Sequence, residues 1–154
     1  MDRTISKEVT VSAHVGDVWK AWTTAEGAAT FFAPRAKIEL ALGGAYELYF
    51  DLEAPEGSRG SEGCHLLSYL PEEMLSFDWD APPQFPELRG RRTWVVVTLH
   101  KPAVNSVRVR LCHLGWGQGE EWERLRHYFD RAWDIVLQRL RQRFSTGPLD
   151  WSRI

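Results

Sequence analysis

The sequence has few cysteines, no long apolar run and no block of charge of one sign. Its two cysteines, Cys64 and Cys112, are too few for a disulfide framework, so we expect a reduced, cytoplasmic protein. No apolar run approaches the length that crosses a bilayer, and the charged, alternating segment 1–11 is neither a signal peptide nor an anchor. We therefore expect no membrane span.

The sequence also lacks a strongly basic segment of the kind that binds nucleic acid. The chain carries 19 Lys and Arg against 21 Asp and Glu, for a formal net charge of −2. The densest basic cluster is Arg89, Arg91 and Arg92, and acidic residues are scattered throughout the chain. Such a surface would gain little from releasing phosphate counterions, so nucleic acid is not expected as a partner.

Common catalytic and metal-binding motifs are absent as well. Ser58 and Ser61 lie among glycines without the spacing of a nucleophile elbow. The pairs Cys64-His65 and Cys112-His113 consist of adjacent strand residues, which face opposite sides of a sheet and cannot chelate one ion. We therefore expect no metal site and no cofactor.

What is present is a regular alternation of element types along 154 residues, a length that predicts one domain over 1–154. Apolar periodicity predicts a strand at 5–11, a helix at 15–25 interrupted by Gly27, a helical turn at 28–32, strands at 35–40, 46–51, 64–70, 75–80, 93–100 and 106–114, and a helix from 119 to about 144. The order predicts an α+β fold, in which a curved antiparallel sheet of about seven strands wraps around the long C-terminal helix.

Aromatic residues are abundant, with eight tryptophans among them. Seven fall on faces that should converge on the gap between the sheet and the last helix: Trp22, Phe32, Tyr46, Phe77, Trp79, Phe129 and Trp133. Each alone fits a plain core, but as a group they are typical of a ligand pocket. Trp19, Phe85 and Trp116, if exposed together, would instead form a patch for a homodimer or another protein.

His113 is the polar residue of most interest. It shares a face with Leu111 at the end of the last strand, close to Trp116. It is either a half-buried histidine that bonds a loop carbonyl, or a group that orients a ligand or acts as a general acid/base. Tyr46 could supply a second orienting hydrogen bond. No catalytic residue is assigned.

Several segments carry a family resemblance: VWKAWT at 18–23, FFAP at 31–34, GGAY at 43–46, PEEMLSFDW at 71–79, HLGWG at 113–117, and Ala132-Trp133. Together they resemble the START/SRPBCC helix-grip superfamily, and more closely its branch similar to the C-terminal domain of the activator of heat-shock protein 90 ATPase. The resemblance implies a seven-stranded antiparallel sheet, two short helices after the first strand, and a long helix roofing a cavity. Members of the superfamily bind lipids, sterols, polyketides or other hydrophobic molecules, and some are cyclases or hydrolases.

In this branch the motif's histidine corresponds to His113 and its helix tryptophan to Trp133. Ala132 stands where the branch usually has glycine, which should narrow the space beside the helix. The co-chaperone activity of the family needs an additional N-terminal domain, which we do not expect in residues 1–154.

Three hypotheses about function follow. The first is a non-catalytic domain that binds a small hydrophobic ligand, lipid-like, aromatic or polyketide-like, between the sheet and the C-terminal helix. The second is a cyclase-like or hydrolase-like enzyme that uses His113 as acid/base. The third is a protein-interaction or co-chaperone-like module.

Overall fold

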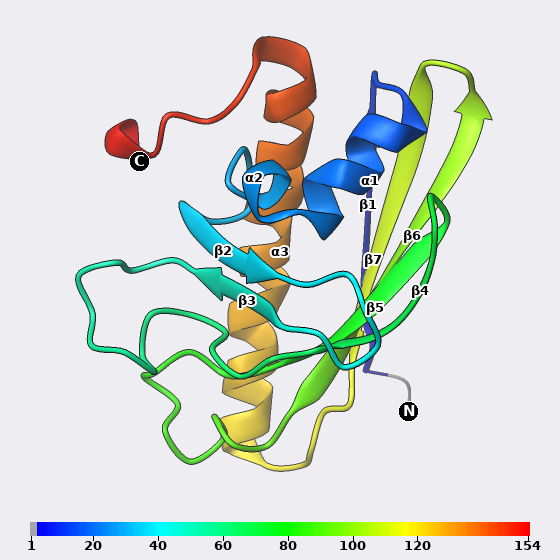
Figure 1. Ribbon diagram of the computed structural model, residues 1–154. Helices are drawn as coiled ribbons and strands as arrows, with labels where there is room; N and C mark the ends of the chain where they lie inside the picture. Colours follow the sequence, from blue (N-terminus) through cyan, green and yellow to red (C-terminus); the bar gives the residue numbers. More distant parts are fainter. Residues whose placement is uncertain (1–2) are drawn as a thin grey trace.

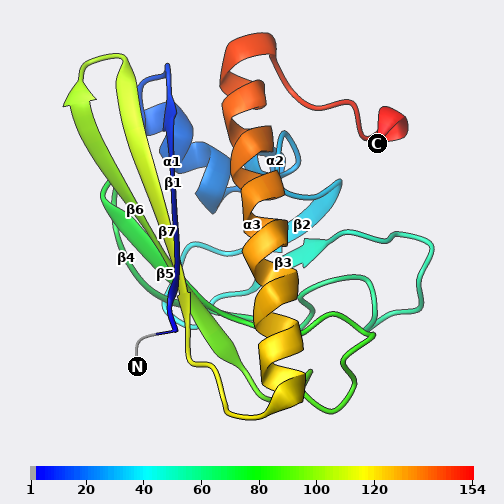
Figure 2. The same ribbon diagram turned by 180° about the vertical axis from the view of Figure 1, so that it is seen from behind.

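The computed structural model describes residues 3–154 and contains two antiparallel sheets and one long helix (Figure 1). The strands are β1 (Ile5–Val11), β2 (Arg35–Ile38), β3 (Tyr46–Tyr49), β4 (Leu66–Leu70), β5 (Met74–Trp79), β6 (Thr93–Ala103) and β7 (Ser106–Leu114). Five of them pair in the order β1-β7-β6-β5-β4, and β2 pairs with β3. The larger sheet runs alongside the long helix, and the two-stranded sheet crosses that helix (Figure 2).

The two sheets are joined by a short stretch of backbone pairing between β3 and β4. Ala45 and His65 form an isolated antiparallel bridge, and the backbone N–H of Tyr46 donates to the carbonyl of Cys64 over 2.8 Å. The seven predicted strands are therefore present, with one interruption where the chain bends. Together with the helices they confirm the predicted α+β helix-grip architecture.

The two short helices follow β1, as α1 (Val15–Thr23) and α2 (Ala25–Ala28). Thr24 separates them, because its side chain caps α2 by accepting a hydrogen bond from the N–H of Gly27 over 2.9 Å. Gly27 was predicted to interrupt the first helix, but it lies inside the second. A Cβ at this position would come within 2.1 Å of the Lys20 carbonyl oxygen, so only glycine allows α1 and α2 to approach this closely.

The long helix α3 (Glu120–Thr146) begins after Gly119 and ends at Gly147. Its first turn carries Glu120, Glu121 and Glu123 and its last turn carries Arg143, a distribution that complements the helix dipole. Its apolar stripe is buried, as the spacing predicts: Trp122, Leu125, Phe129, Trp133, Val136, Leu137 and Leu140. In the part of the chain that the structure describes, no helix is apolar over a stretch long enough to span a bilayer.

After α3 the chain runs out to one side of the molecule, to a short 3-10 helix, η1 (Trp151–Arg153) (Figure 1). The indole N–H of Trp151 donates to the carbonyl of Ala29 over 2.6 Å, and the backbone N–H of Leu149 donates to the carbonyl of Thr30 over 3.0 Å. These bonds fix the C-terminal segment against the turn that precedes β2.

Four fully buried aromatic residues form what we call the inner aromatic layer: Trp22, Phe31, Tyr46 and Phe77. The rings of Tyr46 and Phe77 are stacked with centroids 4.1 Å apart, and the Trp22 ring meets that of Phe31 edge-on at 5.0 Å. The Tyr46 hydroxyl donates to the Trp22 carbonyl over 2.8 Å. The layer thus ties α1 to the sheet through both packing and a buried hydrogen bond.

Candidate functional site

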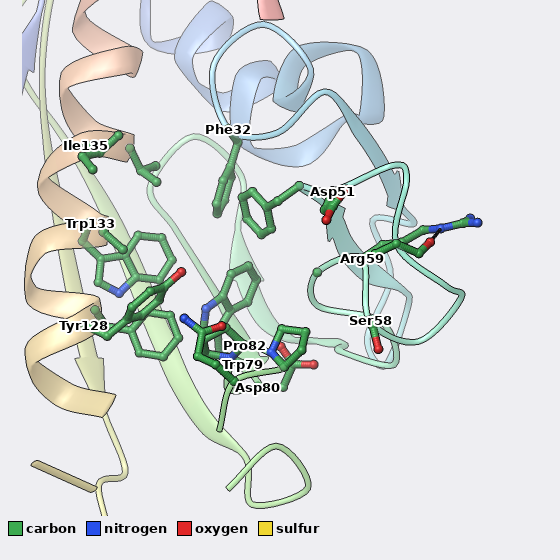
Figure 3. A pocket seen from close by; sticks show the side chains of 18 of the residues that line it. Phe32, Asp51, Ser58, Arg59, Trp79, Asp80, Pro82, Tyr128, Trp133 and Ile135 are labelled. Atoms are coloured by element: carbon green, nitrogen blue, oxygen red, sulfur yellow. Dashed lines mark hydrogen bonds between the residues drawn. The ribbon is translucent and has the colours of Figure 1, made fainter. Parts of the chain in front are cut away.

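A cavity of about 590 Å³ opens to solvent between α3, the end of β5 and two loops (Figure 3). Its walls are the α3 face from Tyr128 to Arg139, Phe32, the pair Trp79-Asp80, and parts of loops 50–60 and 82–84. Most of these side chains are apolar or aromatic. A concave, mainly aromatic site of this size, with a few polar groups, is the usual form of a small-molecule pocket.

Four of the predicted site residues line this cavity: Phe32, Trp79, Phe129 and Trp133. Phe32 stacks near-parallel on Trp79 with centroids 5.8 Å apart and meets Trp133 edge-on at 5.9 Å. Trp79 and Trp133 face each other from β5 and α3 at 5.5 Å. Figure 3 shows Phe32, Trp79 and Trp133 directed into one space from three separate elements. Their role in ligand binding remains a prediction.

The other four predicted site residues, Trp22, Tyr46, Phe77 and His113, do not line the cavity. Three belong to the inner aromatic layer, which lies behind Phe32 and Trp79. Tyr46 cannot orient a ligand as predicted, because its hydroxyl is bonded to the Trp22 carbonyl and the side chain is fully buried. The same burial raises the pKa of Tyr46 well above its usual value.

His113 is fully buried rather than half-buried, and both of its ring nitrogens are bonded. Nε2 lies 2.7 Å from Oγ1 of Thr93, and Nδ1 accepts from the indole N–H of Trp133 over 2.9 Å. Burial lowers the pKa of His113 to about 3, so the ring is neutral at physiological pH. The predicted partner, a loop carbonyl, is wrong, because the partners are the side chains of Thr93 and Trp133. The acid/base role of His113 stays a prediction, and the buried, doubly bonded ring does not favour it.

The predicted surface patch of Trp19, Phe85 and Trp116 does not form. Trp19 is only 8% exposed, because α1 is covered on more than one side. Phe85 packs edge-on against Tyr128 at 6.2 Å, and Trp116 lies against His113 with centroids 4.2 Å apart. A homodimer or protein partner therefore remains a prediction without these residues as its contact surface.

The cavity has a buried carboxyl at one end. Asp80 is 6% exposed, and Nη1 of Arg89 lies 3.3 Å from its Oδ2. Burial raises the pKa of Asp80 to about 7, against the lowering effect of Arg89 and Arg92. The group is therefore divided between its neutral and charged forms near neutral pH.

Arg89 also connects the two loops of the cavity wall. Its guanidinium donates to the carbonyls of Gly57 over 2.5 Å and Gly60 over 2.9 Å in one loop, and to the carbonyl of Ala81 in the other. We call this set of contacts, with Asp80, the Arg89 clamp. It holds loop 50–60 against the segment that follows β5, so the outer wall of the cavity depends on one cation.

Several lining residues were not predicted. Phe50 had a signal, since it shares the alternation of Tyr46 and Leu48, but β3 ends one residue earlier and leaves its side chain 44% exposed at the cavity. Tyr128 lies next to the predicted Phe129. Arg139, near the C-terminal end of α3, also lines the cavity.

Both cysteines are free, and Cys64 accepts a hydrogen bond from Nη1 of Arg92 over 2.8 Å. Burial raises the pKa of the Cys64 thiol above its ordinary value. Within residues 3–154, no three His, Cys, Asp or Glu side chains are grouped in a way that could hold a metal ion.

The sequence model of the family described as Activator of Hsp90 ATPase homolog 1-like protein matches residues 12–145, which confirms the resemblance to this branch of the helix-grip superfamily. No curated protein matches the sequence. Among solved structures, the Aha1 dimer from Colwellia psychrerythraea aligns with a TM-score of 0.70 at 16% identity, over 94% of this chain and 97% of that one.

Two further solved structures are similar. DynU16, a protein in the dynemicin biosynthetic locus, aligns with a TM-score of 0.71 at 18% identity, over 96% of this chain and 49% of that one. The protein BH1534 from Bacillus halodurans aligns with a TM-score of 0.67 at 26% identity, over 92% of this chain and 96% of that one. These likenesses support the helix-grip fold.

Proposed function

The chain belongs to the family of Activator of Hsp90 ATPase homolog 1-like proteins, and we propose that it is a binding domain for a small hydrophobic ligand, lipid-like, aromatic or polyketide-like. The observation that carries the proposal is the solvent-open aromatic cavity between α3, β5 and loops 50–60 and 82–84. A reducing, cytoplasmic setting is in keeping with the two free cysteines.

The cavity is large enough for such a ligand and is not filled by the core. Its volume of about 590 Å³ lies within the range of pockets that enclose small organic molecules. Each 100 Å² of apolar ligand surface buried there would contribute about 2.5 kcal/mol, before the cost of immobilising the ligand is subtracted. Stacking on Trp79, Trp133 and Phe32 would favour planar or ring-containing molecules.

The similarity to DynU16 adds support of a different kind. That protein is described as belonging to the dynemicin biosynthetic locus, and it shares the fold at 18% identity. A binding role in this chain requires no proton transfer, which agrees with a His113 that is bonded at both nitrogens.

Binding of the neutral fluorophore N-phenyl-1-naphthylamine tests the proposal. We expect saturable binding to the wild-type protein and at least a tenfold loss in Ala132→Phe, because the new ring would occupy the space beside Trp133. Gln138→Phe is the matched control, since Gln138 is exposed on the same helix and lies outside the cavity. Absence of saturable binding, or equal binding by Ala132→Phe with its fold intact, would contradict the proposal.

A further inference from the structure

Arg139 lines the cavity, and no carboxylate among residues 3–154 forms an ion pair with it. It lies on α3 and is half-buried, with its guanidinium carbon 5.4 Å from the centroid of the Trp151 ring. Burial alone lowers the pKa of Arg139, and no carboxylate among residues 3–154 is close enough to oppose that effect. A guanidinium held over an indole face keeps its charge and its donor groups, so it is prepared to bind an anion.

The other charged side chains of the cavity each bond to another group of the protein. Asp80 is paired with Arg89, and Nε of Arg59 donates to the Ala54 carbonyl over 2.8 Å. Oδ1 of Asp51 accepts from the N–H of Glu53 over 3.1 Å. Figure 3 shows the Arg59 side chain directed away from Trp79 and Trp133. Among residues 3–154, Arg139 thus differs from the other charged lining residues, because its side chain forms no ion pair or hydrogen bond and contacts only the Trp151 ring.

The two ends of the cavity differ in charge. Figure 3 shows Asp80 at the end near Tyr128, while Ile135 lies farther along α3. Arg139 follows Ile135 by about one helical turn. The acidic group and the available cation are thus separated by the aromatic walls. A ligand with its charge at one end would meet opposite electrostatic environments in its two orientations.

We propose that the ligand is an amphipathic anion, with an apolar or ring-containing body between Trp79 and Trp133 and a carboxylate, sulfonate or phosphate on Arg139. This inference rests on the proposed function, since it specifies the chemistry of the same cavity. An anion would neutralise the half-buried guanidinium and accept its paired N–H groups, while the aromatic walls cover the apolar body. The separation from Asp80 fixes the orientation, with the anionic end toward the C-terminal half of α3.

A cation bound by the aromatic residues and Asp80 is the opposite arrangement. Aromatic rings do attract ammonium groups, but Arg89 already occupies the Asp80 carboxyl at 3.3 Å. The positive charge of Arg139 in the cavity wall would also repel a cationic ligand. The observations therefore favour the anion.

Two fluorophores that share an anilinonaphthalene body separate these cases: anionic 8-anilino-1-naphthalenesulfonate and neutral N-phenyl-1-naphthylamine. We expect Arg139→Met to weaken the anionic probe about tenfold or more, because a charge-assisted hydrogen bond is lost, and to leave the neutral probe within about threefold. Arg139→Lys should retain most of the anion affinity. Arg141→Met, an exposed site on the same helix, is the control for net charge and should change neither probe.

Each outcome of the titrations has one meaning. Competition between the two probes, with loss of the anionic probe alone in Arg139→Met, supports the proposal. Equal weakening of both probes, or none, overturns the role of Arg139 while the proposed binding function stands. Failure of the neutral probe to bind the wild-type protein overturns the binding function itself. Tighter binding of 1-naphthylmethylammonium than of either probe, lost in Asp80→Asn, would reverse the sign of the ligand charge.

Discussion

The indole N–H of Trp133 donates a hydrogen bond to Nδ1 of His113 over 2.9 Å, while Nε2 of the same imidazole lies 2.7 Å from Oγ1 of Thr93. An indole N–H can only donate, so Nδ1 is the acceptor and the ring proton lies on Nε2, with the Thr93 oxygen as its acceptor. The neutral imidazole thus positions Trp133, one of the cavity walls. His113, the histidine of the family motif, therefore has a structural role in this chain: it holds Trp133, which lines the cavity, and does not line the cavity itself.

The buried imidazole makes stability depend on pH in a defined direction. Burial lowers the pKa of His113 to about 3, whereas an unfolded histidine titrates near 6.5. Between pH 3 and pH 6.5 only the unfolded chain takes up a proton on His113. The stability that His113 confers is therefore complete above pH 6.5 and is lost as the pH falls toward 3. The expected slope is about 1.4 kcal/mol per pH unit.

Urea unfolding at pH 7 and pH 5 measures this slope. His113→Gln should be less stable than the wild type at pH 7 and should lose less stability on acidification. His127→Gln, at an exposed site on α3, should keep the wild-type slope. An unchanged slope in His113→Gln would show that the imidazole titrates in the folded protein.

The Trp133–His113 bond can be isolated by replacing the indole with a phenyl ring. Trp133→Phe leaves Nδ1 of His113 buried without a donor, which should cost about 1–3 kcal/mol beyond the loss of packing. Trp22→Phe is the matched control, because the Trp22 indole N–H is buried and has no hydrogen-bond partner among residues 3–154. Chemical denaturation of the two variants should give the larger destabilisation for Trp133→Phe. Equal values would mean that the hydrogen bond adds nothing to stability.

The Arg89 clamp predicts that one substitution loosens two loops. Arg89→Met leaves the Asp80 carboxyl buried without its cation and frees the carbonyls of Gly57 and Gly60, so we expect a loss of about 3 kcal/mol. Hydrogen exchange should accelerate in residues 50–63 and 80–92 more than in β6 and β7. Arg91→Met, at an exposed neighbouring position, should change neither measurement. At pH 8 the double variant with Asp80→Asn should be less destabilised than Arg89→Met, because the amide has no charge to bury and needs no proton.

Asp80 should change the free energy of unfolding with pH in the direction opposite to that of His113. Burial raises the pKa of Asp80 to about 7, above the unfolded value near 3.9, so the folded protein holds a proton that the unfolded chain has released. The stability from this group is complete below about pH 4 and is lost as the pH rises through 7. Asp80→Asn should therefore gain stability relative to the wild type between pH 5 and pH 7, by about 1.4 kcal/mol per unit. A difference that stays constant with pH, measured by urea unfolding, would indicate an Asp80 that is ionised throughout this range.

The sequence predicts the elements of this fold well, because each rests on a local period. The stripe of α3 repeats every three or four residues, and the alternation of Leu75, Phe77 and Trp79 places the last two on the buried face of β5. The family match is carried by the same segments. Gly27 is an exception, since its place inside α2 depends on how closely the Lys20 carbonyl approaches.

The division of the aromatic residues could not be predicted in the same way. Phe77 and Trp79 lie on one face of one strand, yet only Trp79 lines the cavity. What separates them is the non-local packing of Tyr46 over Phe77 and the position of loop 50–60, which the Arg89 contacts fix. The partners of His113 are likewise 20 residues away in each direction, on β6 and on α3. Periodicity identifies the face of a residue but not what covers it.

The inner aromatic layer separates the part of the interior that stabilises the protein from the part that meets solvent. Trp22, Tyr46 and Phe77 are buried, with Tyr46 hydrogen-bonded to the Trp22 carbonyl and stacked on Phe77. Much of the cavity rim instead belongs to loops 50–60 and 82–84, in which no residue is buried. Substitutions in loops 50–60 and 82–84 can therefore change the shape of the cavity entrance while the inner aromatic layer stays intact. The ligand specificity of this fold can therefore be changed, by evolution or by design, through its loops and without altering its buried core.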